Sequence, residues 1–140
     1  MTMVTTSKQD ISRACPCGSS KNYGTCCAPF HQKAKLPATA KQLMRSRYSA
    51  FVFGNAAYLA DTVPAENSGD YDSNSLARQQ TKWIGLEIIS TEAGGIFDQI
   101  GYVEFIARFK EKGRTGTHHE KSRFIRQNGK WLYIDGEFLP

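Results

Sequence analysis

The hydrophobic positions in the middle of the chain repeat with the period of an α-helix. The repeat consists of Met44, Tyr48, Phe51 and Val52. These positions stand at i, i+4, i+7 and i+8 and would form one apolar stripe on a helix surface. Thr39-Ala40-Lys41-Gln42 has the spacing of a capping box, and Gly54-Asn55 suits the end of a helix. The pattern therefore predicts a helix that begins at Thr39 and ends before Gly54.

Two shorter helices are predicted on either side of a polar stretch. AAYLADTV (residues 56–63) reads as a helix that Pro64 stops. ENSGDYDSNS (66–75) has the composition of a loop. LARQQTKW (76–83) predicts the next helix, so the first part of the domain is expected to be helical.

From Trp83 onward the hydrophobic period changes to two, which is the period of a β-strand. Four segments show it: WIGLEIIST (83–91), IGYVEFIARFKEK (100–112), HEKSRFIRQ (119–127) and KWLYIDG (130–136). In the second segment one face carries Val103, Phe105, Ala107 and Phe109. That face is expected to pack against the helices.

Turn signals separate these strands. We expect turns at residues 92–95 and 113–116, and a tight hairpin at Asn128-Gly129, because both of those residues tolerate positive φ angles. Helices followed by an antiparallel meander predict an α+β fold with the helices packed on one face of the sheet.

Composition narrows the class of protein without naming a function. The chain has 140 residues, of which 40% are hydrophobic and 22% charged, as in a globular domain. It contains no run of about 18 apolar residues that could cross a bilayer. The N-terminal MTMVTTSKQDISRA lacks the basic and apolar regions of a signal peptide, so we expect a cytoplasmic protein.

All four cysteines lie between residues 15 and 27. Their order is Cys-x-Cys, eight residues, then Cys-Cys. Thiols stay reduced in the cytoplasm, so clustered cysteines there favour a metal site, and four thiolates suit zinc. A disulfide, a redox site or plain buried thiols are the alternatives, but the Cys-x-x-Cys of redox sites is missing. Four protein ligands would close the coordination sphere, which favours a structural Zn²⁺ held by Cys15, Cys17, Cys26 and Cys27.

The cysteine segment resembles the SEC-C zinc motif. The resemblance rests on Cys15-Pro16-Cys17-Gly18-Ser19, Lys21, Tyr23 and Cys26-Cys27. It implies a zinc-binding module over residues 14–31, preceded by a flexible N-terminus (1–13) and followed by a linker (32–38). The same motif closes the motor subunit of the preprotein translocase, where it contacts an export chaperone, and this implies a protein partner. His31 stands four residues too late to replace the last ligand, so we expect it on the surface.

A second resemblance covers most of the remaining chain. QLMRSRYSAFVFGNAAYL (42–59) and HEKSRFIRQNGKWLYIDG (119–136) are similar to the YchJ-like family of small bacterial proteins. Members join a SEC-C motif to a cone-shaped, nuclear transport factor two-like (cystatin-like) domain, here expected over residues 39–140. The family has no established biochemical activity to carry over.

The cone-shaped fold implies a pocket between the long helix and the sheet. Candidate residues are Arg45, Arg47 and Tyr48 on the helix, and His119, Glu120, Arg123 and Asp135 on the strands. Positions 45 and 47 point about 200° apart on a helix, so only one of these arginines can face inward. We expect that one to form an ion pair with Glu120 or Asp135.

Two further patterns bear on this pocket. Trp131, Tyr133 and Asp135 alternate along one strand, and this predicts an aromatic wall that ends in a carboxylate. The pair His118-His119 beside Glu120 could supply a general base with an orienting carboxylate, or could be surface groups at the start of a strand. Neither pattern by itself identifies the protein as an enzyme.

Three functions remain open from the sequence. The first is a protein-interaction module whose zinc knuckle presents Lys8, Arg13, Lys21, Lys33 and Lys35. The second is a small-molecule binder or enzyme that uses the pocket. The third is nucleic-acid binding, suggested by the formal charge of +5, although bound zinc thiolates would reduce it to about +3. We also expect Cys26→Ser to disorder residues 14–31 and to leave the rest folded.

Overall fold

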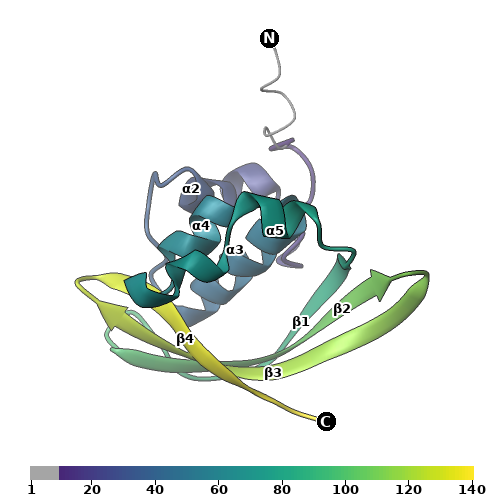
Figure 1. Ribbon diagram of the computed structural model, residues 1–140. Helices are drawn as coiled ribbons and strands as arrows, with labels where there is room; N and C mark the ends of the chain where they lie inside the picture. Colours follow the sequence, from purple (N-terminus) through teal and green to yellow (C-terminus); the bar gives the residue numbers. More distant parts are fainter. Residues whose placement is uncertain (1–9) are drawn as a thin grey trace.

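The computed structural model describes residues 10–140 and consists of helices packed on a curved antiparallel sheet (Figure 1). The helical elements are η1 (Tyr23–Thr25), α2 (Ala28–His31), α3 (Ala40–Phe53), α4 (Ala56–Asp61), η2 (Ala65–Asp70) and α5 (Ser73–Ala77). The strands are β1 (Lys82–Ala93), β2 (Ile100–Glu111), β3 (Arg114–Gln127) and β4 (Lys130–Phe138), hydrogen-bonded in that order. All helices lie on the concave side of the sheet, with α3 closest to it (Figure 1). The predicted α+β fold is confirmed.

The long helix α3 begins and ends where the sequence predicts. The Thr39 hydroxyl accepts a hydrogen bond from the Gln42 amide at 3.1 Å. The Gln42 side chain reaches back to the amide of Ala38, one residue earlier than a capping box requires. Gly54 ends the helix with φ 71°, a left-handed conformation that glycine adopts without steric cost.

The segment between α4 and the sheet differs from the prediction. Residues 66–75 were expected to form a loop, but they contain most of the 3-10 helix η2 and the start of α5. The helix predicted over 76–83 is wrong, because α5 ends at Ala77 and β1 begins at Lys82. Asp72 explains the earlier start, since its carboxylate accepts from the Ser75 amide at 2.8 Å and caps α5.

The hairpins set the register of the sheet. Asn128 and Gly129 have φ angles of 52° and 78°, which confirms the predicted tight turn between β3 and β4. The turn before β3 uses Lys112 and Gly113 in the same conformation, with φ angles of 52° and 79°. The turn predicted over residues 113–116 is therefore wrong, because β3 already begins at Arg114.

A bulge in β4 changes which side chains face the helices. Phe124 pairs with Tyr133 but Arg123 pairs with Asp135, so Ile134 is an extra residue on β4. Trp131 and Tyr133 face the core. Asp135 lies opposite Arg123 on the outer face, so the prediction that it shares the face of Trp131 and Tyr133 is wrong.

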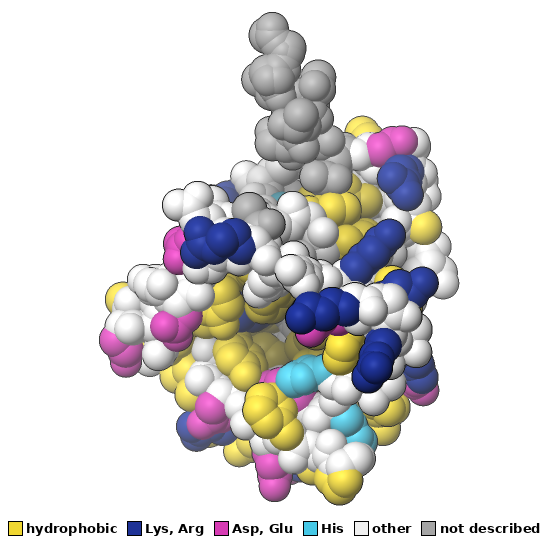
Figure 2. Space-filling view, turned by 45° about the vertical axis from the view of Figure 1, so that its right-hand side comes forward, with side chains coloured by type: hydrophobic (Ala, Val, Ile, Leu, Met, Phe, Trp, Pro, Cys, Tyr) yellow, Lys and Arg dark blue, Asp and Glu magenta, His cyan; other side chains and the backbone are white. Residues whose placement is uncertain are grey.

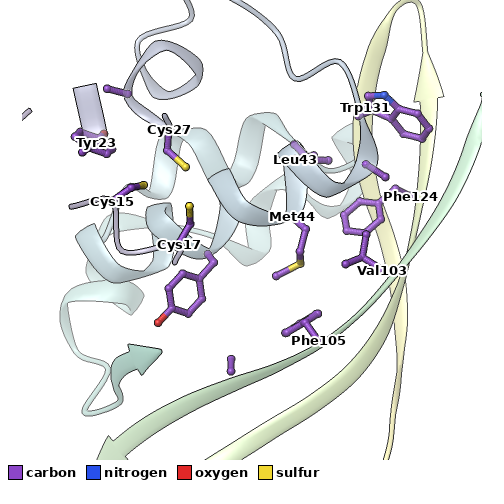
Figure 3. Packing of buried hydrophobic residues seen from close by; sticks show 14 residues of the cluster. Cys15, Cys17, Tyr23, Cys27, Leu43, Met44, Val103, Phe105, Phe124 and Trp131 are labelled. Carbon is purple, nitrogen blue, oxygen red and sulfur yellow. The ribbon is translucent and has the colours of Figure 1, made fainter. Parts of the chain in front are cut away.

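The core joins the cysteine segment to the domain that follows it. One cluster of buried residues contains Cys15, Cys17 and Cys27 together with Leu43, Val103, Phe124 and Trp131. In Figure 3 the cysteines and the residues Val103, Phe124 and Trp131 lie toward opposite ends of α3. The shared cluster means that the cysteine segment packs directly against α3.

The N-terminal region is described in part. Residues 1–9, including Lys8, lie outside the described residues. Residues 10–13, which belong to the predicted flexible N-terminus, are hydrogen-bonded to the cysteine segment. The amides of Tyr23 and Gly24 donate to the carbonyls of Arg13 and Ile11 at 2.7 and 2.9 Å. Among residues 10–140 no helix is long and apolar enough to cross a membrane.

Candidate functional site

Local backbone hydrogen bonds bring the four cysteines together. Ala14 and Asn22 form an isolated antiparallel bridge, and the Cys15 amide donates to the carbonyl of Lys21 at 2.8 Å. This closes a small loop that carries Cys17. Gly18 follows with φ 79°, a conformation that glycine adopts readily. The chain then enters α2 directly after Cys26 and Cys27, which places both beside the first pair.

The sulfur atoms have the spacing of a four-ligand metal site. The Sγ atoms of Cys15, Cys17, Cys26 and Cys27 all lie within 4.8 Å of one another. Zinc–sulfur bonds of about 2.3 Å in a tetrahedron separate the sulfurs by about 3.8 Å. The Sγ atom of Cys26 lies 3.6 Å from that of Cys17 and 3.9 Å from that of Cys27. The predicted cysteines therefore form a candidate metal centre whose dimensions fit a tetrahedral ion.

The electrostatics of this cluster also favour a cation. Hydrogen bonds from Cys15 and Cys27 lower the pKa of Cys17. Burial raises the pKa of Cys26 to about 11, with the neighbouring Cys17 thiolate adding to the effect. Four thiols this close therefore do not ionise together by themselves, because each new thiolate is repelled by those already formed. A divalent ion would supply the compensating charge.

Polar groups around the sulfurs tie the cluster to α3. Ser49 Oγ lies 3.4 Å from the sulfurs of both Cys15 and Cys27. Arg45 Nη1 donates to the carbonyl oxygen of Cys17 at 2.5 Å. Ser19 Oγ lies 3.1 Å from the sulfur of Cys26. Such outer contacts fix the orientation of the ligands in metal sites.

His31 is not the surface residue that we predicted from the sequence. Its Nε2 lies 2.8 Å from the carbonyl oxygen of Ser46 on α3, and its Nδ1 lies 2.6 Å from the Tyr23 hydroxyl. The carbonyl can only accept, so Nε2 carries the proton and Nδ1 accepts from Tyr23. Burial lowers the pKa of His31, which agrees with a neutral ring. His31 thus joins the cysteine segment to α3.

A cavity of about 290 Å³ lies between α3 and the concave face of the sheet. Its walls are mainly aromatic and include Tyr48, Phe51, Tyr71, Trp83, Phe105 and Tyr133. Figure 2 shows the molecule hollowed on this face, with hydrophobic side chains inside and acidic and histidine side chains at the edge of the hollow. The predicted pocket therefore exists, and it has the largely apolar lining that small-molecule sites share.

Arg47 is the inward-facing arginine of α3. Its side chain is buried, and Nη1 donates to the Leu59 carbonyl at 3.0 Å and to Thr62 Oγ1 at 2.6 Å. Its Nη2 donates to the Tyr71 hydroxyl at 3.0 Å. The predicted ion pair with Glu120 or Asp135 is wrong, since no described carboxylate lies within 4.0 Å of the guanidinium. Burial lowers the pKa of Arg47, although the guanidinium stays charged.

Glu120 lies at another wall of the same cavity, and both of its oxygens take part in hydrogen bonds. Its Oε2 accepts from Ser122 Oγ at 2.6 Å and from the Tyr133 hydroxyl at 2.9 Å. Its Oε1 lies 2.7 Å from Nε2 of His118. Burial raises the pKa of Tyr133, so this phenol keeps its proton and donates. Glu120 therefore holds His118 in one orientation beside the cavity.

The remaining pocket candidates lie elsewhere. Arg45 points toward the cysteine segment. His119 and Arg123 lie on the outer face of β3, because neighbouring strand residues face opposite ways. His119 pairs with Glu104 at 2.7 Å, and Arg123 binds Asp135 with Nε and Nη2 at 3.0 and 2.9 Å. Of the seven candidates, the cavity is lined by Arg47, Tyr48 and Glu120.

Sequence reasoning did not place Tyr71 and Trp83 in the cavity. Tyr71 lay in the stretch predicted to be a loop, and Trp83 lay where a predicted helix met a predicted strand. In the structure both line the cavity, and Tyr71 binds Arg47. Nothing in the local sequence pattern pointed to either position, since both are brought in by the path of the chain after α4.

Both the cysteine segment and the domain that follows it match known protein families. The model of the YchJ middle NTF2-like domain matches residues 39–136, and the SEC-C motif matches residues 14–29. The chain is 38% identical over 128 residues to the UPF0225 protein GSU1048 of Geobacter sulfurreducens, covering 90% of this chain and 80% of that protein. Both resemblances found in the sequence are confirmed.

Solved structures with the same arrangement exist. A SEC-C motif containing protein of Rhodopseudomonas palustris, RPA3114, has a TM-score of 0.79 and 32% identity, with 90% of this chain and 98% of that chain covered. A SEC-C motif containing protein of Psychrobacter arcticus has a TM-score of 0.74 and 28% identity, with 89% and 82% covered.

Proposed function

The chain belongs to the family defined by the YchJ middle NTF2-like domain and the SEC-C motif, and from this premise we propose that it binds a small molecule in the cavity beneath α3, on a framework that a structural zinc ion holds together. The cavity carries this proposal. It keeps about 290 Å³ open beside two buried charged side chains, Arg47 and Glu120. Protein interiors are normally close-packed, so a space of this size is expected to remain open only where it serves a ligand.

Zinc is the ion that this donor set favours. Four thiolates in a tetrahedron suit Zn²⁺, and all coordination positions would be taken by protein. Such a closed site leaves no position for water or substrate, so its role is to hold the chain. Elemental analysis of protein purified without chelator should find about one zinc per chain, and Cys27→Ser should lower this content. Stoichiometric iron, or no metal, would contradict the assignment.

The cavity can be tested without knowing its ligand. N-phenyl-1-naphthylamine is a neutral probe whose fluorescence rises in apolar surroundings. We expect it to bind the intact protein and to lose binding in Ala107→Phe, because Ala107 faces the cavity and a phenyl ring there would fill it. Ala107→Leu is a milder second variant in case the larger ring disturbs folding.

Ile106→Phe provides the matched control. Ile106 is the neighbour of Ala107 on β2 and faces the opposite side of the sheet. This variant should bind the probe as the wild type does. Equal fluorescence from wild type and both Ala107 variants, each with a cooperative thermal transition, would show that the cavity is not the binding site.

Protein docking through the cysteine segment is a second candidate function. Arg13, Lys21, Lys33 and Lys35 are exposed around this segment, and none forms an ion pair with a described residue. Such a patch suits an acidic protein surface. A pull-down with the intact protein should recover partners that a Lys21→Glu/Lys33→Glu variant loses. Identical recovery by both would rule out this surface.

A further inference from the structure

The hydrogen-bond donors of the cavity are not all used. A guanidinium has five N–H donors. In Arg47 two on Nη1 bind Leu59 and Thr62, and one on Nη2 binds Tyr71. Five minus three leaves the Nε–H and one Nη2–H without a partner among the described residues. Arg47 lines the cavity and its Nε is not fully enclosed, so these donors are open to an acceptor on a ligand.

Trp83 supplies a second unpaired hydrogen-bond donor in the cavity. The indole Nε1 of Trp83 is buried and has no hydrogen-bond partner in the part of the chain that the structure describes. Trp83 also lines the cavity. It is the one buried side-chain nitrogen or oxygen of residues 10–140 in this condition. Arg47 and Trp83 therefore both offer hydrogen-bond donors to an acceptor group on whatever binds in the cavity.

The charge of Arg47 is only partly compensated. Its guanidinium carbon lies 5.0 Å from the ring centre of Tyr133, 5.2 Å from that of Tyr71 and 6.0 Å from that of Phe51. Aromatic faces stabilise a cation, but less than a carboxylate does. Buried charges are normally paired with an opposite charge. Arg47 has no such partner within 4.0 Å among residues 10–140.

Glu120 does not fill this role, because its oxygens are already engaged. Three hydrogen bonds, from Ser122, Tyr133 and His118, hold it on its own wall. Its presence nevertheless limits the ligand. The charges of Glu120 and Arg47 cancel, so a carboxylate would leave the cavity with one net negative charge and a phosphate dianion with two. A singly charged anion fits the cavity better than a phosphate.

Resting on the small-molecule function proposed above, we propose that the ligand is a monocarboxylic acid with a flat apolar body. Its carboxylate accepts hydrogen bonds from the free Nε–H and Nη2–H of Arg47. The same two atoms of Arg123 bind the carboxylate of Asp135 at 3.0 and 2.9 Å in this structure, which shows the geometry that a carboxylate takes on an arginine. The body of the acid lies among Phe51, Trp83 and Phe105. A volume of about 290 Å³ equals about ten water molecules of bulk liquid, enough for a small ring system.

A matched pair of ligands tests the carboxylate. 2-Naphthoate and 2-naphthamide have the same rings and shape, but only the first is an anion. Isothermal titration calorimetry of the full-length protein should show naphthoate binding about tenfold more tightly, as expected when one charge-assisted contact is gained. Arg47→Gln should abolish this preference while naphthamide binds as before. Arg123→Gln removes the same charge from the outer face and should leave the preference intact.

A milder variant covers the case in which Arg47→Gln does not fold. Trp83→Phe keeps an aromatic ring in the half-buried position but removes the indole N–H and part of the ring surface. The lost ring contact should weaken both compounds, and the lost donor should weaken naphthoate about threefold more than naphthamide (a fraction of one hydrogen bond).

These experiments distinguish carboxylate recognition by Arg47 from small-molecule binding in the cavity as such. If N-phenyl-1-naphthylamine binds in the cavity but naphthoate and naphthamide bind equally, the carboxylate inference is overturned and the cavity function stands. If neither the neutral probe nor either naphthalene compound binds, the small-molecule function fails and the inference fails with it.

Discussion

Single polar side chains at the junction help to attach the cysteine segment to the domain. His31 is the clearest case, because it bridges Tyr23 in that segment and Ser46 on α3. Both bonds require a neutral ring with the proton on Nε2. A proton on Nδ1 would meet the Tyr23 hydroxyl, which already donates there. His31 is therefore a structural joint whose strength depends on pH.

The first prediction concerns the pH dependence that His31 contributes. Burial lowers its pKa in the folded state, so the unfolded chain binds the proton more readily. The stability from a neutral His31 is complete above the unfolded pKa of about 6.5 and is lost as the pH falls below it. Urea denaturation of the wild type between pH 7.5 and 5.5 should show stability falling by up to about 1.4 kcal/mol per pH unit from this group.

His31→Gln isolates this contribution from that of the thiols. The variant keeps one polar contact, so it should be less stable by about 1–3 kcal/mol at pH 7.5. Its stability should fall less steeply toward pH 5.5 than that of the wild type. Parallel slopes for the two proteins would show that His31 does not change protonation on unfolding.

Gly136 gives a second prediction at the scale of a residue. It pairs with Ser122, and a Cβ at this position would collide with the carboxylate of Glu120. Gly136→Ala should displace Glu120 from its three hydrogen-bond donors and reduce the free energy of unfolding by about 1–3 kcal/mol. Chemical denaturation measures this, and the imidazole NMR signals of His118 should shift because its partner moves.

Gly69→Ala is the matched control, since a Cβ there meets no atom within 4 Å. It should change stability by less than about 0.5 kcal/mol. If Gly136→Ala is equally harmless, then Glu120 is not confined as the structure describes it.

At the scale of elements, α3 serves both sites at once. Residues Arg45 and Ser49 are four apart and both contact the cysteine segment. Residues Arg47 and Tyr48 point to the cavity. A period of 3.6 residues places these two sets on different sides of one helix. The position of α3 therefore sets the geometry of the candidate metal centre and of the cavity together.

The N-terminal cap of α3 can be weakened without touching either site. Thr39→Ala removes the hydroxyl that accepts from the Gln42 amide. It should reduce the free energy of unfolding by about 1 kcal/mol. Thr39→Ser keeps the hydroxyl and should restore most of this loss. Urea denaturation of the three proteins checks it, and equal midpoints would mean that this cap does not limit stability.

The strands show most clearly which side-chain orientations the hydrophobic pattern can predict and which it cannot. Alternation along residues 100–112 placed Val103 and Phe105 correctly, because β2 is regular and one face is buried. Asp135 was misplaced, because a bulge at Ile134 reverses the faces after Tyr133. An extra residue in one strand leaves no trace in the alternation, since it depends on the partner strand. Register shifts of this kind become visible only in the paired structure.

The two sites differ in how far the sequence defined them. The cysteines could be identified because they lie within thirteen residues and share one chemistry. The cavity draws on α3, on the segment after α4 and on the strands, so its members meet only through the fold. Arg47 and Glu120 were found through their residue types, whereas the apolar neighbours Phe51 and Trp83 resemble any core residues. Chemical type, more than sequence separation, made a position predictable.

At the scale of the whole molecule, the candidate metal centre and the domain share one core. Cys15, Cys17 and Cys27 are buried in the cluster that contains Leu43 and Phe124. Hydrogen bonds from His31 and Arg45 add to this attachment. The sequence led us to expect that Cys26→Ser would leave residues 39–140 folded. The shared cluster favours the opposite outcome, in which loss of the metal weakens the entire chain.

The last prediction tests that coupling with Cys17→Ser and with removal of the metal by a chelator. Cys17 is fully buried, and its loss should open the thiolate cluster and lower the free energy of unfolding by more than about 4 kcal/mol, the range seen when a structural metal is lost. Trp131 reports on the far end of the same core, where its indole donates to the Ala38 carbonyl at 3.1 Å. In a Trp83→Phe background, the Trp131 fluorescence and the far-UV circular dichroism of the metal-free protein should both show unfolding at the same, lowered denaturant concentration.

Thr25→Ala is the control. Thr25 is an exposed residue beside Cys26, so this variant should behave as the wild type. A Trp131 transition that stays near the wild-type midpoint after the metal is lost would show that the domain folds by itself and that the cysteine segment is only appended to it.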